Sequence, residues 1–455
     1  MKETKFKQTE VGMIPIDWEV KKLGHLCSLW GRIGFRGYTR EDLVEAHKGA
    51  ITFSPSDIHN QKIDLENCTY ISLKKYEESP EIKVFNGDII FGKTASIGKC
   101  ALVEGLSEKA TINPQFVLMN NFKCNNRFLY YQLIDKPFQT NIWTICGGST
   151  IPTMSQEKLK QQQIAFPSTY AEQTAIANAL SDVDTLIANL EKLIAKKKNI
   201  KQGAMQQLLT GKKRLPGFAP DERQKECHSE RSAKREVEES NGYKMTELGL
   251  IPSDWENVNI SKTCTIKARI GWQGLKSTEY LNSGDYILVT GTDFKNGFID
   301  WSTCSYVSEW RFKQDKNIQI KKGDVLVTKD GTIGKVAFLN EIPMEGTLNS
   351  GVFVVRSKDL KKIDSVYLSL VFKSSWFDNF LDEITSGSTI VHLYQKDFVK
   401  FNFPIPSSIE EQTAIANVLS DMDTEISALE TKLAKCRTLK TGMMQQLLTG
   451  KIRLV

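Results

Sequence analysis

Apolar residues recur at alternating steps of four and three in two long segments of the chain. In the first segment they fall at Ile176, Leu180, Val183, Ile187, Leu190 and Ile194, and in the second at Ile415, Leu419, Met422, Ile426, Leu429 and Leu433. This spacing is a heptad seam, and it predicts two amphipathic helices of about 38 residues, each roughly 57 Å long. Gly211 and Gly450 follow the last Leu-Leu-Thr of each segment and are expected to end the helices.

The two helical segments are copies of one sequence. Residues 172–215 and 411–454 align without gaps and are identical at 29 of 44 positions. A seam of this length needs a partner, and the simplest partner is the other copy, in an antiparallel coiled coil. The alternative is a pair of separate surface helices, each packed on its own domain.

A looser repeat covers the rest of the chain. TEVGMIPIDW at 9–18 matches TELGLIPSDW at 246–255, and GRIGFRGYT at 31–39 matches ARIGWQGLK at 268–276. Within each copy, short β-rich runs bounded by turn residues predict strands, as at 88–91, 324–327, 163–167 and 402–406. Helical spacing with bulky aromatic residues, expected to be core, occurs at 126–143 and 364–384.

The predicted fold is α+β. It has two similar mixed α/β domains separated by two long antiparallel helices, which form a coiled coil and give the chain a pseudo-two-fold organisation. The expected segments are a first domain at 1–167, a central helix at 168–212, a charged linker at 213–243, a second domain at 244–406 and a C-terminal helix at 407–452. The linker is polar and rich in mixed charge, so it cannot bury a core.

Composition describes an ordinary globular chain. It has 455 residues, of which 40% are hydrophobic and 25% charged, with a net charge of +6. This mild positive charge permits nucleic-acid binding without arguing for it. No long apolar run predicts a transmembrane span, and the N-terminus lacks the apolar core of a signal peptide. Nine cysteines without a C-x-x-C pair predict free thiols, and the expected location is the cytoplasm.

Several near-motifs for catalysis fail on inspection. GKTASIGKC at 92–100 has the wrong spacing for a phosphate loop, and NPQF at 113–116 departs from the adenine-methyltransferase tetrapeptide at Gln115. The other copy of the repeat departs further in both places. Neither copy contains a nucleophile triad, a nuclease carboxylate pair or a metal cluster. We therefore expect no active site, metal or cofactor in this chain.

The remaining chemistry is suited to binding DNA. Arginine and glutamine read guanine and adenine edges, while lysine and short hydroxyl side chains suit phosphate oxygens. The candidates in the first domain are Arg32, Arg36, Tyr38, Arg40, Lys93, Ser96, Lys99, Ser149 and Thr150. Those in the second are Arg269, Trp272, Gln273, Lys276, Lys329, Thr332, Lys335, Ser388 and Thr389. The alternative is that these loops are solvated turns between strands.

Within this set we expect base edges to be contacted by Arg32, Arg36, Arg269 and Gln273. Phosphate contacts are expected from Lys93, Lys99, Lys329 and Lys335. The two domains keep the same polar loop types but carry different candidate readers. Two like domains held by a rigid spacer would read two different short sequences at a fixed separation.

The layout resembles the specificity (S) subunit of type I restriction–modification enzymes. The resemblance covers nearly the whole chain and is carried by three repeated motifs: the G-x-I-P-x-D-W openings at 12–18 and 249–255, the EQTAIAN-x-LSD-x-D helix starts at 172–184 and 411–423, and the QQLLTGK-x-RL ends at 206–215 and 445–454. It implies a non-catalytic subunit with two target recognition domains. The alternatives are a stand-alone DNA methyltransferase or nuclease, and a coiled-coil adaptor that joins two protein ligands.

The resemblance also implies partners. They are double-stranded DNA carrying a bipartite, asymmetric target, two methyltransferase (M) subunits and motor-nuclease (R) subunits, with no membrane. S-adenosylmethionine, ATP and Mg²⁺ are expected on the partner subunits, which methylate adenine and cleave the DNA. The long helices would set the spacer and contribute to the M-binding surface.

Overall fold

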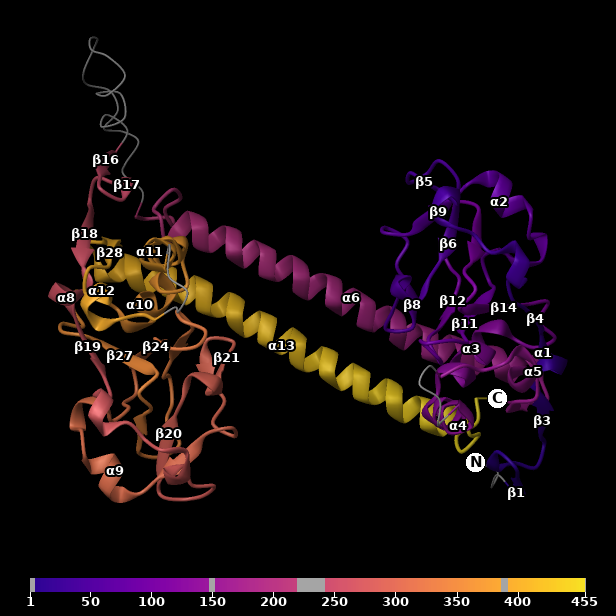
Figure 1. Cartoon of the computed structure of the whole chain (residues 1–455). Helices are drawn as coiled ribbons and strands as arrows, with labels where there is room; N and C mark the ends of the chain where they lie inside the picture. Colours follow the sequence, from indigo (N-terminus) through magenta and orange to yellow (C-terminus); the bar gives the residue numbers. More distant parts are fainter. Residues whose placement is uncertain (1–4, 147–151, 219–241, 386–391, 455) are drawn as a thin grey trace, which may run out of the picture. The chain divides into compact units, whose positions relative to one another are not determined.

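The computed structural model describes residues 5–146, 152–218, 242–385 and 392–454 (Figure 1). Most of the predicted linker, 219–241, lies outside the described residues. The chain forms two compact units: Met1–Lys192 with Thr431–Val455, and Leu193–Glu430. Each unit therefore contains one mixed domain and part of both long helices.

Unit 1 is built from short strands and helices. Its strands are β1 (Phe6–Thr9), β2 (Gly12–Pro15), β3 (Trp18–Lys22), β4 (Ser28–Trp30), β5 (Leu43–Val44), β6 (Ala50–Phe53), β7 (Ile58–His59), β8 (Lys62–Ile63), β9 (Thr69–Ile71), β10 (Lys83–Val84), β11 (Ile89–Gly92), β12 (Cys100–Leu102), β13 (Ala110–Ile112), β14 (Phe116–Asn120) and β15 (Gln163–Pro167). Its short helices are α1 (Leu23–Leu26), α2 (Leu73–Glu77), α3 (Asn126–Ile134), α4 (Lys136–Cys146) and α5 (Gln156–Lys160).

Two sheets form the body of unit 1. One has the strand order β12-β11-β14-β4 and the other β10-β13-β6-β9-β5. The first sheet is buried on both faces. Because alternate side chains of a strand point to opposite faces of the sheet, neighbouring residues join different cores. Ile89 and Phe91 of β11 join the core shared with the helices, whereas Ile90 joins the core shared with the second sheet.

Unit 2 repeats this plan. Its strands are β16 (Tyr243–Thr246), β17 (Gly249–Pro252), β18 (Trp255–Asn259), β19 (Cys264–Ala268), β20 (Tyr286–Val289), β21 (Phe294–Lys295), β22 (Phe298–Ile299), β23 (Ser305–Val307), β24 (Val325–Thr328), β25 (Val336–Phe338), β26 (Gly346–Leu348), β27 (Val352–Ser357) and β28 (Asn402–Pro406). Its short helices are α8 (Ile260–Thr263), α9 (Glu309–Lys313), α10 (Ser365–Val371), α11 (Ser375–Thr385) and α12 (Gln395–Phe398).

The first sheet of unit 2 matches that of unit 1, whereas its second sheet has three strands in place of five. The doubly buried sheet has the order β19-β27-β24-β25, and the second sheet has the order β23-β20-β26. Along β24, Val325 and Val327 face the helix-side core while Leu326 faces the core of the second sheet. In both units the last strand before the long helix pairs with the strand of the Asp-Trp opening, β15 with β3 and β28 with β18.

The long helices are α6 (Tyr170–Leu208) and α13 (Ile409–Leu447), each of 39 residues. Five of the six seam residues predicted in α6 are buried and Val183 is half-buried; the α13 seam is buried or half-buried throughout. In unit 1, Asp184 pairs with Lys440 at 2.7 Å and Glu191 with Arg437 at 2.7 Å. As the number rises along α6 it falls along α13, so the helices run antiparallel, as predicted.

Unit 2 holds its portion of the helix pair in the same way. Lys197 pairs with Glu425 at 2.7 Å and Lys201 with Asp423 at 2.5 Å. The Lys201–Asp423 pair is the repeat counterpart of Lys440–Asp184, because both members shift by the same interval along the chain. These pairs are partly exposed and contribute little energy, and the buried seam supplies most of the stabilisation.

Glycine ends both helices, as predicted from the sequence. Gly211 and Gly450 have φ angles of +69° and +68°, a left-handed conformation that favours glycine. Each glycine also lies against the Ile-Pro segment of the adjacent opening. A Cβ at Gly211 would lie 2.4 Å from Cγ of Pro252, and one at Gly450 would lie 2.4 Å from Cγ of Pro15.

Candidate nucleic-acid interface

The predicted reading loop of unit 1 connects the two sheets. It leaves β4, forms a single 3₁₀ turn at Gly34–Arg36 and continues through a second turn at Arg40–Asp42 to β5. Two backbone hydrogen bonds define the first turn, from Arg36 N to the Ile33 carbonyl at 2.9 Å and from Gly37 N to the Gly34 carbonyl at 3.2 Å. The loop therefore contains a hydrogen-bonded turn.

Arg32 is buried in this loop, with only 6% of the residue exposed. Its Nε donates to the Ile112 carbonyl at 3.1 Å, and its Nη2 donates to Oγ1 of Thr111 at 3.1 Å. Burial lowers the pKa of the Arg32 guanidinium, and Tyr38 packs over it at 5.4 Å. In this position the guanidinium donates to groups inside the domain, and its contact with a base edge stays a prediction.

Arg269 occupies the corresponding place in unit 2 and is 2% exposed. Its Nε donates to the Leu348 carbonyl at 2.9 Å and its Nη2 donates to Oγ1 of Thr347 at 3.1 Å. Burial again lowers the pKa of the guanidinium. The expectation of base contact thus meets the same obstacle for both arginines: their donors are already bonded inside the domain.

Gln273 is also buried, at 7% exposure. It lies in the 3₁₀ turn Gly271–Gln273, and its side-chain Oε1 is buried without a hydrogen-bond partner among the described residues. The neighbouring Trp272 belongs to the same turn, but its side chain lies outside what the structure describes. The Gln273 side chain is therefore covered in this structure.

The other predicted loop residues are more accessible. Arg36 is half-buried, with its Nη1 3.6 Å from Oε2 of Glu81. Tyr38 is half-buried beside Arg32, and Arg40 is exposed. In unit 2, Lys276 is exposed and its backbone amide donates to Glu279 at 2.8 Å. These residues remain candidates for DNA contact.

The lysine loop of unit 1 connects β11 and β12. Lys93 is half-buried, and burial lowers the pKa of its ammonium group. The Nζ of Lys99 donates to the carbonyls of Pro55 at 2.5 Å and Ile58 at 3.3 Å, so it braces the turn before β7. Ser96 is half-buried and its carbonyl accepts from the backbone of Lys99. Lys99 is therefore less free to hold phosphate than the sequence suggested.

The corresponding loop of unit 2 connects β24 and β25. Lys329 is half-buried, with its Nζ 5.7 Å from the centre of the Phe353 ring. Thr332 and Lys335 are both exposed, and their backbone groups bond to Thr328, which closes the loop. Lys335 is the counterpart of Lys99, yet it is exposed where Lys99 is held inward.

Segments far apart in sequence meet at these loops. Thr94 forms a β-bridge with Thr153, and Met154 donates its amide to the Lys93 carbonyl at 2.8 Å. In unit 2, Leu393 donates to the Lys329 carbonyl at 3.0 Å. Thr153, Met154 and Leu393 thus lie next to the lysine loops. The nearby predicted DNA contacts lie outside the described residues: Ser149, Thr150, Ser388 and Thr389.

Sequence reasoning missed a pair of arginine clamps. In unit 1, Arg453 donates from Nη1 and Nη2 to the Asp17 carboxylate at 3.0 and 2.7 Å, and from Nη2 to Glu172 at 2.7 Å. The Glu172 side chain is only 1% exposed. The hydrogen bond from Arg453 lowers the pKa of Asp17. Arg453 therefore ties the segment after α13 to the Asp-Trp opening and to the first turn of α6.

Arg214 forms the same clamp in unit 2. It donates to Asp254 at 2.8 and 2.9 Å and to Glu411 at 2.5 and 2.6 Å. The side chains of Arg214 and Glu411 are 6% and 2% exposed. Burial raises the pKa of Glu411, an effect that Arg214 opposes. Both clamps lie in the three repeated motifs, and that coincidence was the available signal for them.

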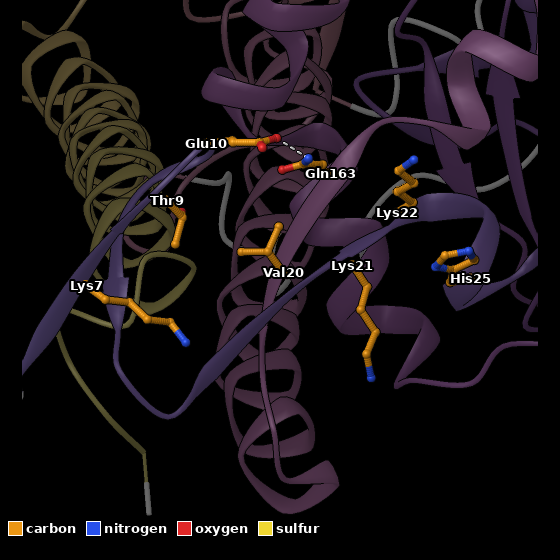
Figure 2. Close-up of a pocket in the computed structure, with 8 residues that line it drawn as sticks. All are labelled: Lys7, Thr9, Glu10, Val20, Lys21, Lys22, His25 and Gln163. Atoms are coloured by element: carbon orange, nitrogen blue, oxygen red, sulfur yellow. Dashed lines mark hydrogen bonds between the residues drawn. The ribbon is translucent and has the colours of Figure 1, made fainter.

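A basic cleft of about 550 Å³ lies beside the N-terminal hairpin in unit 1 (Figure 2). Its lining includes three lysines, Lys7, Lys21 and Lys22, together with His25 and one carboxylate, Glu10. Lys7 donates to the Ile16 carbonyl at 2.9 Å, and Lys21 pairs with Glu19 at 2.7 Å. Val258 and Asn259 of unit 2 align with Lys21 and Lys22 of unit 1. The two units therefore do not share the positive charges of this cleft.

Among the described residues, no three His, Cys, Asp or Glu side chains are grouped so that they could hold a metal ion. No helix in the described parts of the chain is both long and apolar enough to cross a bilayer.

The fold and its duplication define a two-domain recognition scaffold, and comparison with known proteins identifies its family. The family model for the type I restriction modification DNA specificity domain matches residues 15–202 and 252–435. The chain therefore belongs to the type I restriction–modification specificity subunits. This family recognises DNA and is not itself catalytic.

Individual relatives agree with this assignment. The chain is 27% identical over 459 residues to the putative type I restriction enzyme MjaX specificity subunit of Methanocaldococcus jannaschii, covering 99% of this chain and 97% of the relative. It is 24% identical to the EcoBI specificity subunit of Escherichia coli over 354 residues, covering 76% of this chain and 69% of the relative. A crystal structure of the S subunit from M. genitalium has the same fold, with a TM-score of 0.58, 17% identity and 98% of each chain covered.

Proposed function

We propose that this chain reads a bipartite, asymmetric DNA target, with one half-site bound by each unit. Its own part is sequence recognition, without an active site. Methylation of adenine and cleavage of the DNA belong to the M and R subunits, which carry S-adenosylmethionine, ATP and Mg²⁺. We place the complex in the cytoplasm.

The observation that carries the proposal is a shared backbone with different side chains. Both units form the same 3₁₀ turn after the buried arginine, at Gly34–Arg36 and at Gly271–Gln273. Arg36 in one turn corresponds to Gln273 in the other, and Tyr38 corresponds to Leu275. Equal frames with unequal side chains are suited to reading two different sequences.

The accessible cations supply candidate phosphate contacts. Arg40 lies on the reading loop of unit 1, while Lys276 and Lys335 lie on the two loops of unit 2, and all three are exposed. Neutralising phosphates releases counterions, so such contacts raise the affinity for every DNA sequence. In this proposal they position the duplex, while the loop side chains distinguish bases.

The test is methylation mapping of DNA in cells that contain the partner subunits, with and without this chain. We expect one bipartite motif with two unlike halves, and its modification should disappear without the chain. A modified motif that persists without the chain would contradict the proposal. In a companion measurement, calorimetry of the purified chain should show no S-adenosylmethionine binding under conditions where the M-containing complex binds it.

A DNA footprint of the M-containing complex distinguishes this proposal from an adaptor role. A coiled-coil adaptor that only joins protein ligands would leave no protected bipartite site in a DNA footprint. We expect two protected segments separated by an unprotected or weakly protected spacer.

A further inference from the structure

We infer that Arg32 and Arg269 are positioning residues. Each holds the 3₁₀ turn that follows it, Gly34–Arg36 or Gly271–Gln273, at a fixed place on its domain. We call these two turns the reading turns, because their own side chains would discriminate bases. This inference rests on the proposed function and adds to it the residues that fix the position of each reading turn.

The first support is that both domains make the same buried contacts. Each arginine uses Nε to bind the carbonyl at the end of one strand, Ile112 of β13 or Leu348 of β26. Each uses Nη2 to bind the threonine before that carbonyl, at 3.1 Å in both units. Two domains that differ in their loop side chains have thus kept one arrangement of donors and acceptors.

The threonines extend this network into the second sheet's core. Oγ1 of Thr111 donates to the Ile82 carbonyl at 3.1 Å, and Oγ1 of Thr347 donates to the Ile318 carbonyl at 3.4 Å. Both threonines are 0% exposed. A hydroxyl that donates in one direction and accepts from the arginine in the other leaves the guanidinium little freedom to move.

The second support is the turn that directly follows each arginine. In unit 1 its amide-to-carbonyl distances are 2.9 and 3.2 Å, and in unit 2, for Gln273 to Ile270 and Gly274 to Gly271, they are 2.9 and 3.0 Å. The arginine backbone lies two residues before each turn. Fixing the arginine therefore fixes where the turn begins.

The third support is that the same anchor reaches the lysine loop. The strand end that accepts from Arg32 continues into a turn whose Gln115 carbonyl accepts from Lys93 N at 2.8 Å. In unit 2 the Gly351 carbonyl accepts from Lys329 N at 2.9 Å. One anchor thus sets the reading turn relative to the loop that carries the candidate phosphate contacts.

Arginine is needed for this task because of its shape. A guanidinium presents donors in a planar fork and can bind a carbonyl and a hydroxyl at once, whereas a lysine ammonium acts as a point charge. Replacing Arg269 with lysine keeps the charge but loses the fork. We therefore expect Arg269→Lys to release the turn without removing the cation.

The experiment measures binding of the complex with its M subunits to its mapped target and to targets with single base changes in either half. Arg269→Lys and Arg269→Gln should reduce discrimination about tenfold in the half read by unit 2 and leave the other half unchanged. Arg32→Lys and Arg32→Gln should give the mirror result. Non-specific affinity and its salt dependence should stay at the wild-type level in all four variants.

Thr347→Val provides a milder variant in case an arginine substitution prevents assembly. It removes one acceptor while nearly preserving side-chain volume, and we expect a smaller loss of discrimination confined to the same half. Lys335→Gln is the matched control on the same unit. It should lower the affinity for all sequences and leave discrimination intact.

Three outcomes would overturn the inference. Equal weakening of all sequences with a smaller salt slope would make Arg269 a phosphate contact. A new preferred base would make it a direct reader. A lower melting temperature with unchanged discrimination would leave it a role in stability alone. Failure of the wild-type complex to prefer any bipartite target would instead refute the proposed function.

Discussion

The Arg214 clamp supports a quantitative prediction for the substitution Arg214→Gln. The substitution removes four hydrogen bonds to two carboxylates, and one of them, Glu411, has a side chain only 2% exposed. Breaking a buried ion pair by removing one partner costs about 3–5 kcal/mol, because the remaining charge is left buried and unpaired. The bonds to Asp254 add little, since that side chain is 57% exposed.

The expected signal is a large shift in thermal unfolding. The unit Leu193–Glu430 has about 240 residues, a size at which 1 kcal/mol corresponds to roughly 2–4 °C, so the melting temperature should fall by about 6–20 °C. Calorimetry on the full chain is the assay. The transition of the unit that contains the clamp should move more than the transition of the other unit.

A second substitution distinguishes an unpaired charge from lost packing. Glu411→Gln in the Arg214→Gln background removes the orphaned carboxylate, so the double variant should be more stable than Arg214→Gln alone. A fall in melting temperature of less than about 2 °C for Arg214→Gln, or a double variant that is less stable still, would refute the reasoning. Arg453→Gln is the matched comparison, with Glu172 as its buried carboxylate.

Four further predictions concern other parts of the chain. Gly211→Ala should destabilise the chain by about 1–3 kcal/mol, because a left-handed φ and the approach of Pro252 both oppose a Cβ. Gly442 lies in the interior of α13, and a Cβ there would have nothing within 4 Å, so Gly442→Ala should stabilise the chain by roughly 0.5–1 kcal/mol in the same calorimetric assay. Lys373→Met should stabilise the chain at pH 7, because burial lowers the pKa of this lysine from 10.5 to about 8. The folded chain then binds fewer protons than the unfolded chain between these values, so the advantage of the variant should shrink as pH rises from 8 to 10.5, and a gain that is independent of pH would contradict this. Arg40→Gln in the assembled complex should lower affinity for all DNA sequences and reduce the salt slope by about one unit, whereas a change in the preferred motif would show that Arg40 reads a base.

The helices and the general fold could be predicted because their signals are local and periodic. The seam of α6, the terminal glycines and the strands β15 and β28 all follow from spacing along the chain, and the structure confirms them. Because the sequence repeats, each element predicted for the first unit is also predicted at the aligned residues of the second unit.

The roles of individual loop residues were harder to predict. Arg32 and Arg269 have the composition and glycine-rich setting of DNA contacts, but their partners lie about 80 residues away in strands that only the folded domain brings near. Likewise, Arg453 meets Asp17 from the opposite end of the sequence. Burial of a polar group depends on such distant acceptors, so loop chemistry alone could not separate an anchor from a reader.

The doubly buried sheet has a consequence for how this protein can diverge. The side chains of β11 and β24 that face the helices belong to different cores from those that face the second sheet. Substitutions beneath the reading loops can therefore accumulate in one core while the packing against the helices stays intact. Mutations on the face of this sheet toward the second sheet could therefore change the target sequence without altering the side chains that pack against the helices.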